Sequence, residues 1–235
     1  MKVLMFGWEF PPYSSGGLGT ACYGLTKSLS KNHIYITFVL PYDYDSQSDF
    51  IHFLPLNVKI RKIGSLLKPY ISSSIYQKTV KGRKYNPNMY GASLFDEVYR
   101  YSEMANEIAL AEDFDIIHCH DWMTFKAGIN AKKIKNKPLV VHVHATEFDR
   151  TGGHGVNQYV YNIEKEGMEY ADCVIAVSNF TKDKIIEHYG INPSKIYVIH
   201  NSVEPKNDKI FEIKKYEKVV LFLGRITLQK GPDYF

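Results

Sequence analysis

Short apolar segments alternate with segments of helical periodicity along most of this 235-residue chain. The apolar runs are continuous and end at turn residues, which is typical of strands buried on both faces of a sheet. We expect strands at 2–8, 33–41, 57–63, 115–120, 138–144, 172–178 and 195–200. We expect helices at 93–112, 122–135, 157–170 and 179–190, and one after the glycines near residue 17, where one face collects Leu18, Ala21, Cys22, Leu25 and Leu29.

Strands that alternate with helices predict an α/β protein, with a Rossmann-like open, mostly parallel sheet and helices on both faces. We expect this domain to span 1–200, with an insertion of little periodicity near 42–92. The polar stretch 201–218 is interpreted as a linker, and 219–224 as a buried strand. On this interpretation 219–235 is the start of a truncated C-terminal domain; the alternative makes 219–224 an edge strand of the first sheet.

Composition excludes several classes of protein. The net charge of +4 is mild and forms no basic stripe, so we expect no nucleic-acid partner. Apolar runs all fall short of the ~18 residues of a membrane span, so we expect no integral membrane segment. The odd number of cysteines predicts reduced thiols and a cytoplasmic location; they are Cys22, Cys119 and Cys173.

Three glycines gather in the turn Ser-Ser-Gly-Gly-Leu-Gly-Thr (14–20), between the first strand and the first helix. Cys22 stands where a dinucleotide fingerprint has its third glycine, and no Gly-Lys-Ser/Thr of a Walker loop follows. Glycines let backbone N–H groups approach a ligand, and a helix N-terminus favours an anion. A bound phosphate and a simple tight turn both remain open for this segment.

Histidines cluster at the ends of two expected strands. His118 and His120 share one face of the first strand, and His142 and His144 share one face of the second. In a parallel sheet these positions approach the carboxyl edge, where ligands of open α/β sheets bind. We expect a site role for His120, His144 and the adjacent Asp121, and a satisfied, buried role for His118 and His142. Zinc would need three or four of these rings to converge, so we expect no metal.

Arg225 and Lys230 follow the strand expected at 219–224, in the turn before a helix. Two fixed cations beside a helix N-terminus can hold a diphosphate and stabilise it as a leaving group. The alternative is that both are ordinary exposed surface cations.

Six segments, in this order, resemble the two-domain (GT-B) retaining glycosyltransferases of the glycogen and starch synthase and family 4 group. The segments are EFPPYSSGGLG, HCHDW, VVHVHAT, DCVIAVSNFTK, YVIHNSVEP and LFLGRITLQKGPDYF. The resemblance implies the N-terminal half of a GT-B fold. It also implies a nucleotide-sugar donor (ADP-glucose or UDP-glucose), a glycan acceptor and no cofactor.

The resemblance assigns roles to matching residues of this chain. It implies donor binding by Gly16 and Gly17, a place beside the transferred sugar for His144 and Asp121, and neutralisation of the leaving diphosphate by Arg225 and Lys230. Glycogen synthases usually carry Lys-Thr before the glycine pair, where this chain has Ser14 and Ser15, and this weakens an ADP-glucose assignment.

The expected function is a glycogen-synthase-like transfer of glucose, with a family 4 transferase for cell-surface polysaccharide as the alternative. The family's paired C-terminal glutamates would lie beyond Phe235, so we expect the 235-residue chain alone to have little or no transferase activity. A non-catalytic module that binds carbohydrate or nucleotide is a further alternative. The broken glycine fingerprint disfavours a Rossmann-type oxidoreductase.

Overall fold

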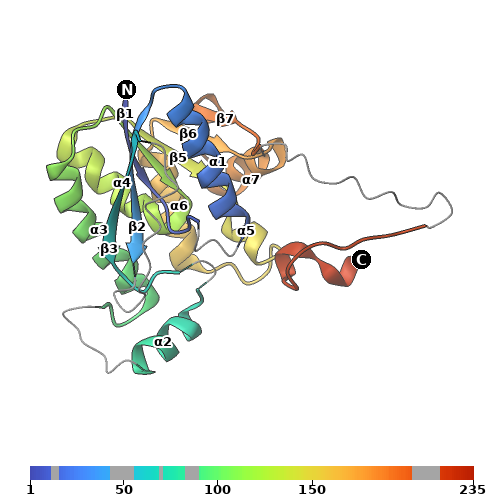
Figure 1. Cartoon of the computed structure of the whole chain (residues 1–235). Coiled ribbons are helices and arrows are strands. Elements are labelled where there is room, and N and C mark those ends of the chain that lie inside the picture. The colour runs from blue at the N-terminus through green and yellow to red at the C-terminus, as the bar shows by residue number, and fades with distance from the viewer. Residues whose placement is uncertain (12–15, 43–55, 69–70, 83–89, 203–217) are drawn as a thin grey trace.

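The computed structural model describes residues 1–11, 16–42, 56–68, 71–82, 90–202 and 218–235. Seven parallel strands form one sheet in the order β3-β2-β1-β4-β5-β6-β7 (Figure 1). They are β1 (Lys2–Phe6), β2 (Tyr35–Tyr42), β3 (Val58–Gly64), β4 (Ile116–His120), β5 (Leu139–Val143), β6 (Cys173–Ala176) and β7 (Ile196–Val198). The predicted α/β class with a Rossmann-like parallel sheet is confirmed.

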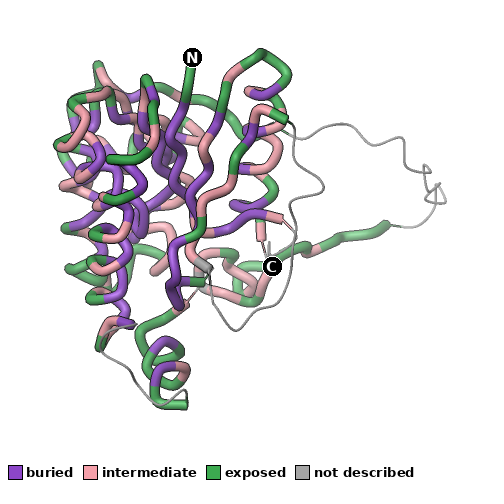
Figure 2. The backbone as a smooth tube through the Cα atoms, turned by 60° about the vertical axis from the view of Figure 1, so that its left-hand side comes forward, coloured by how far each residue is buried: buried purple, intermediate pink, exposed green. Residues whose placement is uncertain are grey.

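Helices cover both faces of this sheet. The α-helices are α1 (Gly17–Lys31), α2 (Ser73–Gly82), α3 (Leu94–Ala111), α4 (Trp122–Lys135), α5 (Glu147–Arg150), α6 (Gln158–Tyr170) and α7 (Asn179–Tyr189). Helix α4 packs between α3 and α6 on one face, and α1 packs on the other with Val3 and Met5 of β1. Figure 2 shows that buried residues follow the strands and the inner sides of the helices.

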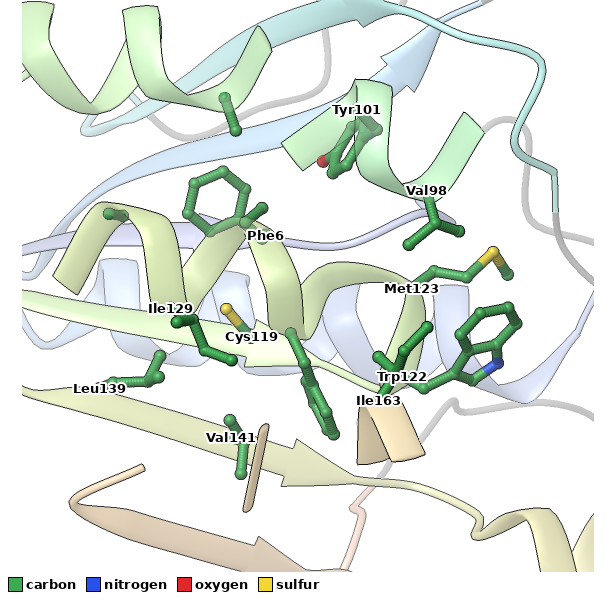
Figure 3. Close-up of a cluster of buried hydrophobic side chains, with 14 of the residues drawn as sticks. Phe6, Val98, Tyr101, Cys119, Trp122, Met123, Ile129, Leu139, Val141 and Ile163 are labelled. Atoms are coloured by element: carbon green, nitrogen blue, oxygen red, sulfur yellow. The ribbon is translucent and has the colours of Figure 1, made fainter. Parts of the chain in front are cut away.

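The larger apolar core lies under α3, α4 and α6 (Figure 3). Phe6, Cys119 and Val141 reach it from three neighbouring strands, because alternate residues of a strand point to opposite faces. Two helical glycines let the layers approach closely. A Cβ on Gly128 would collide with Cys119, and one on Gly167 would collide with Phe125.

Local capping explains why several expected helix bounds are accurate. The Ser178 hydroxyl accepts a hydrogen bond from the Thr181 N–H, and Gly190 ends α7 in the left-handed conformation at φ 67°. Both roles were predicted from the sequence. Ser93 caps α3 in the same way through the Asp96 N–H.

The stretch 42–92 contains more regular structure than the sequence suggested. Its expected strand is β3, which pairs with β2 at the edge of the main sheet, and α2 was not anticipated. The remainder of the stretch (43–55, 69–70 and 83–89) lies outside the described residues, as do residues 203–217 of the proposed linker.

The prediction of a buried strand at 219–224 is wrong for this chain. The segment forms no strand, and the side chains of Val220 and Leu223 are 81% and 91% exposed. The alternative of an edge strand is also wrong, since the sheet ends at β7. An apolar extended segment needs a neighbouring strand for its backbone hydrogen bonds. None of the described residues provides that strand here.

The strand order reverses direction at β1, in the middle of the sheet. Strand β1 has β2 on one side and β4 on the other, so the chain winds in opposite directions from β1. Ligands of open α/β sheets bind outside the carboxyl ends of the strands at such a reversal. Strand β4 ends here at His120, and β5 beside it ends one residue before His144.

Candidate active site

Asp121 joins the carboxyl ends of β4 and β5. It has φ 59°, a left-handed value that is uncommon for a side chain other than glycine. Its N–H donates to the His142 carbonyl oxygen (2.9 Å), and its Oδ1 accepts from the His144 N–H (2.7 Å). These two bonds fix the backbone at His144, so Asp121 acts here as a positioning group for that residue.

The Asp121 carboxyl group is buried, and burial raises its pKa to about 6. The positive charge of Arg150 and the backbone N–H groups of His144 and Ala145 act in the opposite direction. The backbone N–H groups that directly follow β5 therefore stabilise the charged form of this carboxyl group.

His144 lies directly beyond β5, and its ring contacts a second histidine. His144 Nε2 and His120 Nδ1 lie 3.0 Å apart, within hydrogen-bonding distance. Burial lowers the pKa of His144 to about 3 and that of His120 well below its usual range. Both rings are neutral at physiological pH, so they form hydrogen bonds without carrying charge.

All four clustered histidines lie on the face of the sheet that α1 covers. The ring centroids are 4.4 Å apart for His118 and His120, 4.2 Å for His142 and His144, and 5.5 Å for His118 and His142. We expected His118 and His142 to be satisfied core residues apart from the site. They are buried, but their rings join the cluster, and His118 Nε2 and both ring nitrogens of His142 have no hydrogen-bond partner among the described residues. In-register pairing of β4 with β5 brings the rings together.

The glycine turn leads into α1, which lies beside the histidine cluster. The Gly16 N–H donates to Glu9 Oε1 (2.6 Å), and α1 begins at Gly17. A Cβ built on Gly17 would have no described atom within 4 Å, so the space beside this helix N-terminus is open. Residues 12–15 of the turn lie outside the described residues.

Helix α1 brings Cys22 to the histidines. The Sγ atom of Cys22 and ring nitrogens of His120 and His144 lie within 4.8 Å of one another. Burial raises the pKa of the Cys22 thiol well above its usual range, and the carboxyl groups of Asp121 and Glu9 add to this effect. The predicted residues Gly16, Asp121 and His144 therefore belong to one region at the carboxyl edge.

An ionic network that the sequence analysis missed supports the loop after His144. Arg150 donates to Glu147 (3.0 Å) and to the Ala145 carbonyl oxygen (2.8 Å), and it pairs with Glu164. Glu164 also accepts bonds from the Glu147 N–H (3.1 Å) and the Tyr189 hydroxyl group.

One sequence signal could have located the start of this network. Thr146 and Asp149 form a capping box at the start of α5, and the spacing Thr-x-x-Asp is visible in the sequence. The pairing of Arg150 with Glu164 on α6 depends on tertiary structure and has no local signal.

The two predicted diphosphate-binding cations lie in the C-terminal segment. Lys230 is exposed and ends a 3-10 helix, η3 (Leu228–Lys230), which contacts α5 (Figure 1). Arg225 is half-buried in the same segment. The segment therefore reaches α5, three residues after His144. The role of both cations at a diphosphate stays a prediction.

The site combines neutral imidazoles, a positioned carboxyl group and an open helix N-terminus. Neutral imidazoles suit hydrogen bonds to hydroxyl groups, and a helix N-terminus suits an anion such as phosphate. None of the α-helices among the described residues has the length and apolar character that a membrane span requires. The three cysteines are free thiols.

Comparisons with known proteins agree with this architecture. An uncharacterised glycosyltransferase of Methanocaldococcus jannaschii is 27% identical over 100% of this chain and 58% of its own length. A glycogen synthase of Mycobacterium tuberculosis is 23% identical over 98% of this chain and 56% of its own length. The chain thus spans somewhat more than half the length of these relatives.

A similar fold occurs in the catalytic domain of Starch Synthase IV from Arabidopsis thaliana, solved with ADP and acarbose. The TM-score is 0.58 at 17% sequence identity, over 86% of this chain and 51% of that one. The sequence model of the family described as Glycosyltransferase Family 4 matches residues 15–207. This match covers most of the chain, including the glycine turn and the histidine cluster. The chain therefore belongs to Glycosyltransferase Family 4.

Proposed function

We propose that the intact protein is a retaining, glycogen-synthase-like glycosyltransferase that moves glucose from ADP-glucose or UDP-glucose to a glycan acceptor. The observation that carries this proposal is the placement of His144. Asp121 holds its backbone at the carboxyl edge, and α1 passes beside its ring. A starch synthase with a similar fold binds ADP and acarbose, and this supports a nucleotide donor and an α-glucan acceptor.

Each site residue has a part in the proposed reaction. The neutral His144 ring donates or accepts a hydrogen bond at a sugar hydroxyl, and Asp121 keeps that ring in place. The N-terminus of α1 at Gly16 and Gly17 receives the donor phosphates, since the space beside Gly17 is open.

Charge that develops on the leaving diphosphate requires fixed cations. Arg225 and Lys230 are the proposed source, and the contact of η3 with α5 brings their segment beside the loop that follows β5. We further propose that 219–235 begins a donor-binding domain, because the exposed apolar side chains of Val220 and Leu223 need a partner layer. A cytoplasmic location agrees with the three free thiols.

The test is an assay of the intact protein with ADP-glucose and UDP-glucose against glycogen and short α-glucans. We expect nucleotide-dependent glucose transfer with an α-linked product, read by anomeric NMR signals. His144→Ala should lower kcat/KM by about 100- to 1,000-fold. The matched control is His154→Ala, which changes an exposed histidine in the loop between α5 and α6 and should stay within about twofold.

The same assay separates the alternatives. Transfer to lipid-linked or simple sugar acceptors, with none to glucan, would identify a transferase of cell-surface polysaccharide. Glycan or nucleotide binding without any turnover would identify a binding module and overturn the proposed reaction. Full activity of His144→Ala would remove His144 from the mechanism.

A further inference from the structure

We propose that His118, His120 and His142 hold a divalent transition-metal ion on the α1 face of the sheet, with Zn²⁺ as the reference ion. The ion takes no part in the proposed transfer reaction, whose leaving group is proposed to be stabilised by fixed cations. The glycosyltransferase proposal therefore does not depend on this ion.

Strand pairing creates a three-histidine arrangement. His118 and His120 are two residues apart on β4 and point to the same face, and His142 is the in-register partner of His120 on β5. One ring nitrogen from each residue lies within 4.8 Å of the other two. A tetrahedral zinc site with Zn–N bonds of ~2.0–2.1 Å requires nitrogens about 3.4 Å apart. An ion would therefore require the three rings, of which His118 and His142 are now stacked, to rotate toward a common point.

The unpaired nitrogens point to a ligand. His118 Nε2, His120 Nε2 and both ring nitrogens of His142 are buried and have no hydrogen-bond partner among the described residues. An unpaired buried polar atom costs about 1–3 kcal/mol each, so four of them in one cluster are a large penalty. A metal ion would use one lone pair from each of the three rings and remove most of that penalty. Imidazole is a preferred ligand of zinc, copper, iron and nickel.

The other nitrogen of His120 already has a partner. His120 Nδ1 lies 3.0 Å from His144 Nε2, so an ion on His120 Nε2 would leave the Nδ1–H to donate to His144. Metal-ligating histidines usually donate their second ring N–H to such an outer partner. The same contact argues against the other group of three, Cys22, His120 and His144, because two of its nitrogens satisfy each other.

The surrounding charge also favours a cation. The carboxyl groups of Glu9 and Asp121 are both buried and both act on Cys22, which lies against the cluster. Arg150 offsets the charge of Asp121. Glu9 Oε1 accepts only the Gly16 N–H among the contacts described, and Glu9 Oε2 has no described partner. Both acidic groups act on Cys22 at the side of the cluster, so a buried cation there would have acidic groups on the same side to lower the cost of burial.

The experiment measures metal binding by the intact protein, purified without a histidine tag and stripped with a chelator. Equilibrium dialysis against Zn²⁺ or Co²⁺, followed by elemental analysis, should give one equivalent per chain. Bound Co²⁺ should show the strong visible absorption of a tetrahedral site. X-ray absorption of the Zn²⁺ form should show nitrogen ligands and no sulfur. The spectra need no variant, so a variant that fails to fold does not weaken the test.

Two variants test the ligand set, each checked for folding by circular dichroism. His118→Ala and His142→Ala should each weaken Zn²⁺ affinity more than 100-fold, beyond the ~10- to 100-fold typical of outer partners. His154→Ala and Cys22→Ser should leave affinity unchanged. Substoichiometric metal in the wild-type protein, a sulfur ligand, or full binding by His142→Ala would each overturn the proposal. Because the readout is metal content, this failure is distinct from a failure of the glycosyltransferase assay.

Discussion

Two clusters of buried polar groups flank the carboxyl end of β5, and they differ in how their atoms are satisfied. In the Arg150 cluster, the guanidinium group, Glu147 and Glu164 bond to one another and to backbone atoms. In the histidine cluster, four ring nitrogens have no partner among the described residues. In the chain, His142 and His144 of the histidine cluster precede Glu147 and Arg150 of the Arg150 cluster by only a few residues.

This difference separates a structural role from a binding role. A fully paired buried network makes its segment rigid, and here that segment is the loop that His144 begins. An unpaired buried group is a cost that natural proteins retain for a function. The Arg150 cluster thus positions the loop after His144, and the histidine cluster is where we propose that a metal ion binds.

The largest effect is expected from removing the positive charge of the Arg150 cluster. Arg150→Met leaves the buried carboxyl groups of Glu147 and Glu164 without their counter-charge. We expect a loss of about 4 kcal/mol in the free energy of unfolding, measured by urea denaturation. Lys132→Met is the control, because the Lys132–Asp172 pair is partly exposed and should change stability by less than about 1 kcal/mol. Equal losses in both variants would contradict a special role for Arg150.

A second test examines the charge of Glu164. Burial raises the pKa of Glu164 to about 7 from 4.5, although Arg150 and Tyr189 oppose the shift. The folded state therefore holds a proton up to about pH 7, whereas the unfolded state releases it near pH 4.5, so stability falls as pH rises through this window. The Glu164→Gln variant has an amide at this position, which does not titrate, so it serves as the reference.

The measurement is the stability of wild-type protein relative to Glu164→Gln at several pH values. We expect the wild-type protein to lose up to about 3 kcal/mol relative to the variant between pH 4.5 and pH 7, because one pKa unit corresponds to about 1.4 kcal/mol. A difference that does not change with pH would show that Glu164 keeps an ordinary pKa.

The smallest expected change in the free energy of unfolding comes from a substitution in the histidine cluster. His142→Leu replaces a buried ring, whose two nitrogens lack described partners, with an apolar side chain. In metal-free protein, we expect the free energy of unfolding to change by less than about 1 kcal/mol or to rise, because no hydrogen bond is lost. Urea denaturation in a chelating buffer measures this change. A loss above about 2 kcal/mol would mean that His142 has partners in the folded protein.

Much of the fold followed from local patterns. The expected helix at 122–135 has the bounds of α4, and Ser178 and Gly190 delimit α7 as predicted. The failures involve segments whose structure depends on a distant partner. Helix α2 has few apolar residues, of which Tyr76 and Val80 are buried against other elements. Segment 219–224 has strand-like composition, but the described structure gives it no strand to pair with.

The site was predicted in part. The sequence placed His120, Asp121 and His144 at the carboxyl edge, because parallel strands end on the same side of a sheet. It did not indicate that Asp121 is bonded to the backbone of His144, or that Arg150 pairs with Glu164 on another helix. These contacts join residues 14 to 23 positions apart, beyond the reach of helical or strand periodicity.

Local sequence patterns were enough to predict β1 to β7, most of the longer helices, the caps of α7 and the residue types at the carboxyl edge, since these depend on neighbours within a few positions. Only the tertiary structure decided the strand order β3-β2-β1-β4-β5-β6-β7 and the register that pairs His120 with His142. Register sets which side chains share a face, so it converts two separate His-x-His segments into one cluster of four rings beneath α1.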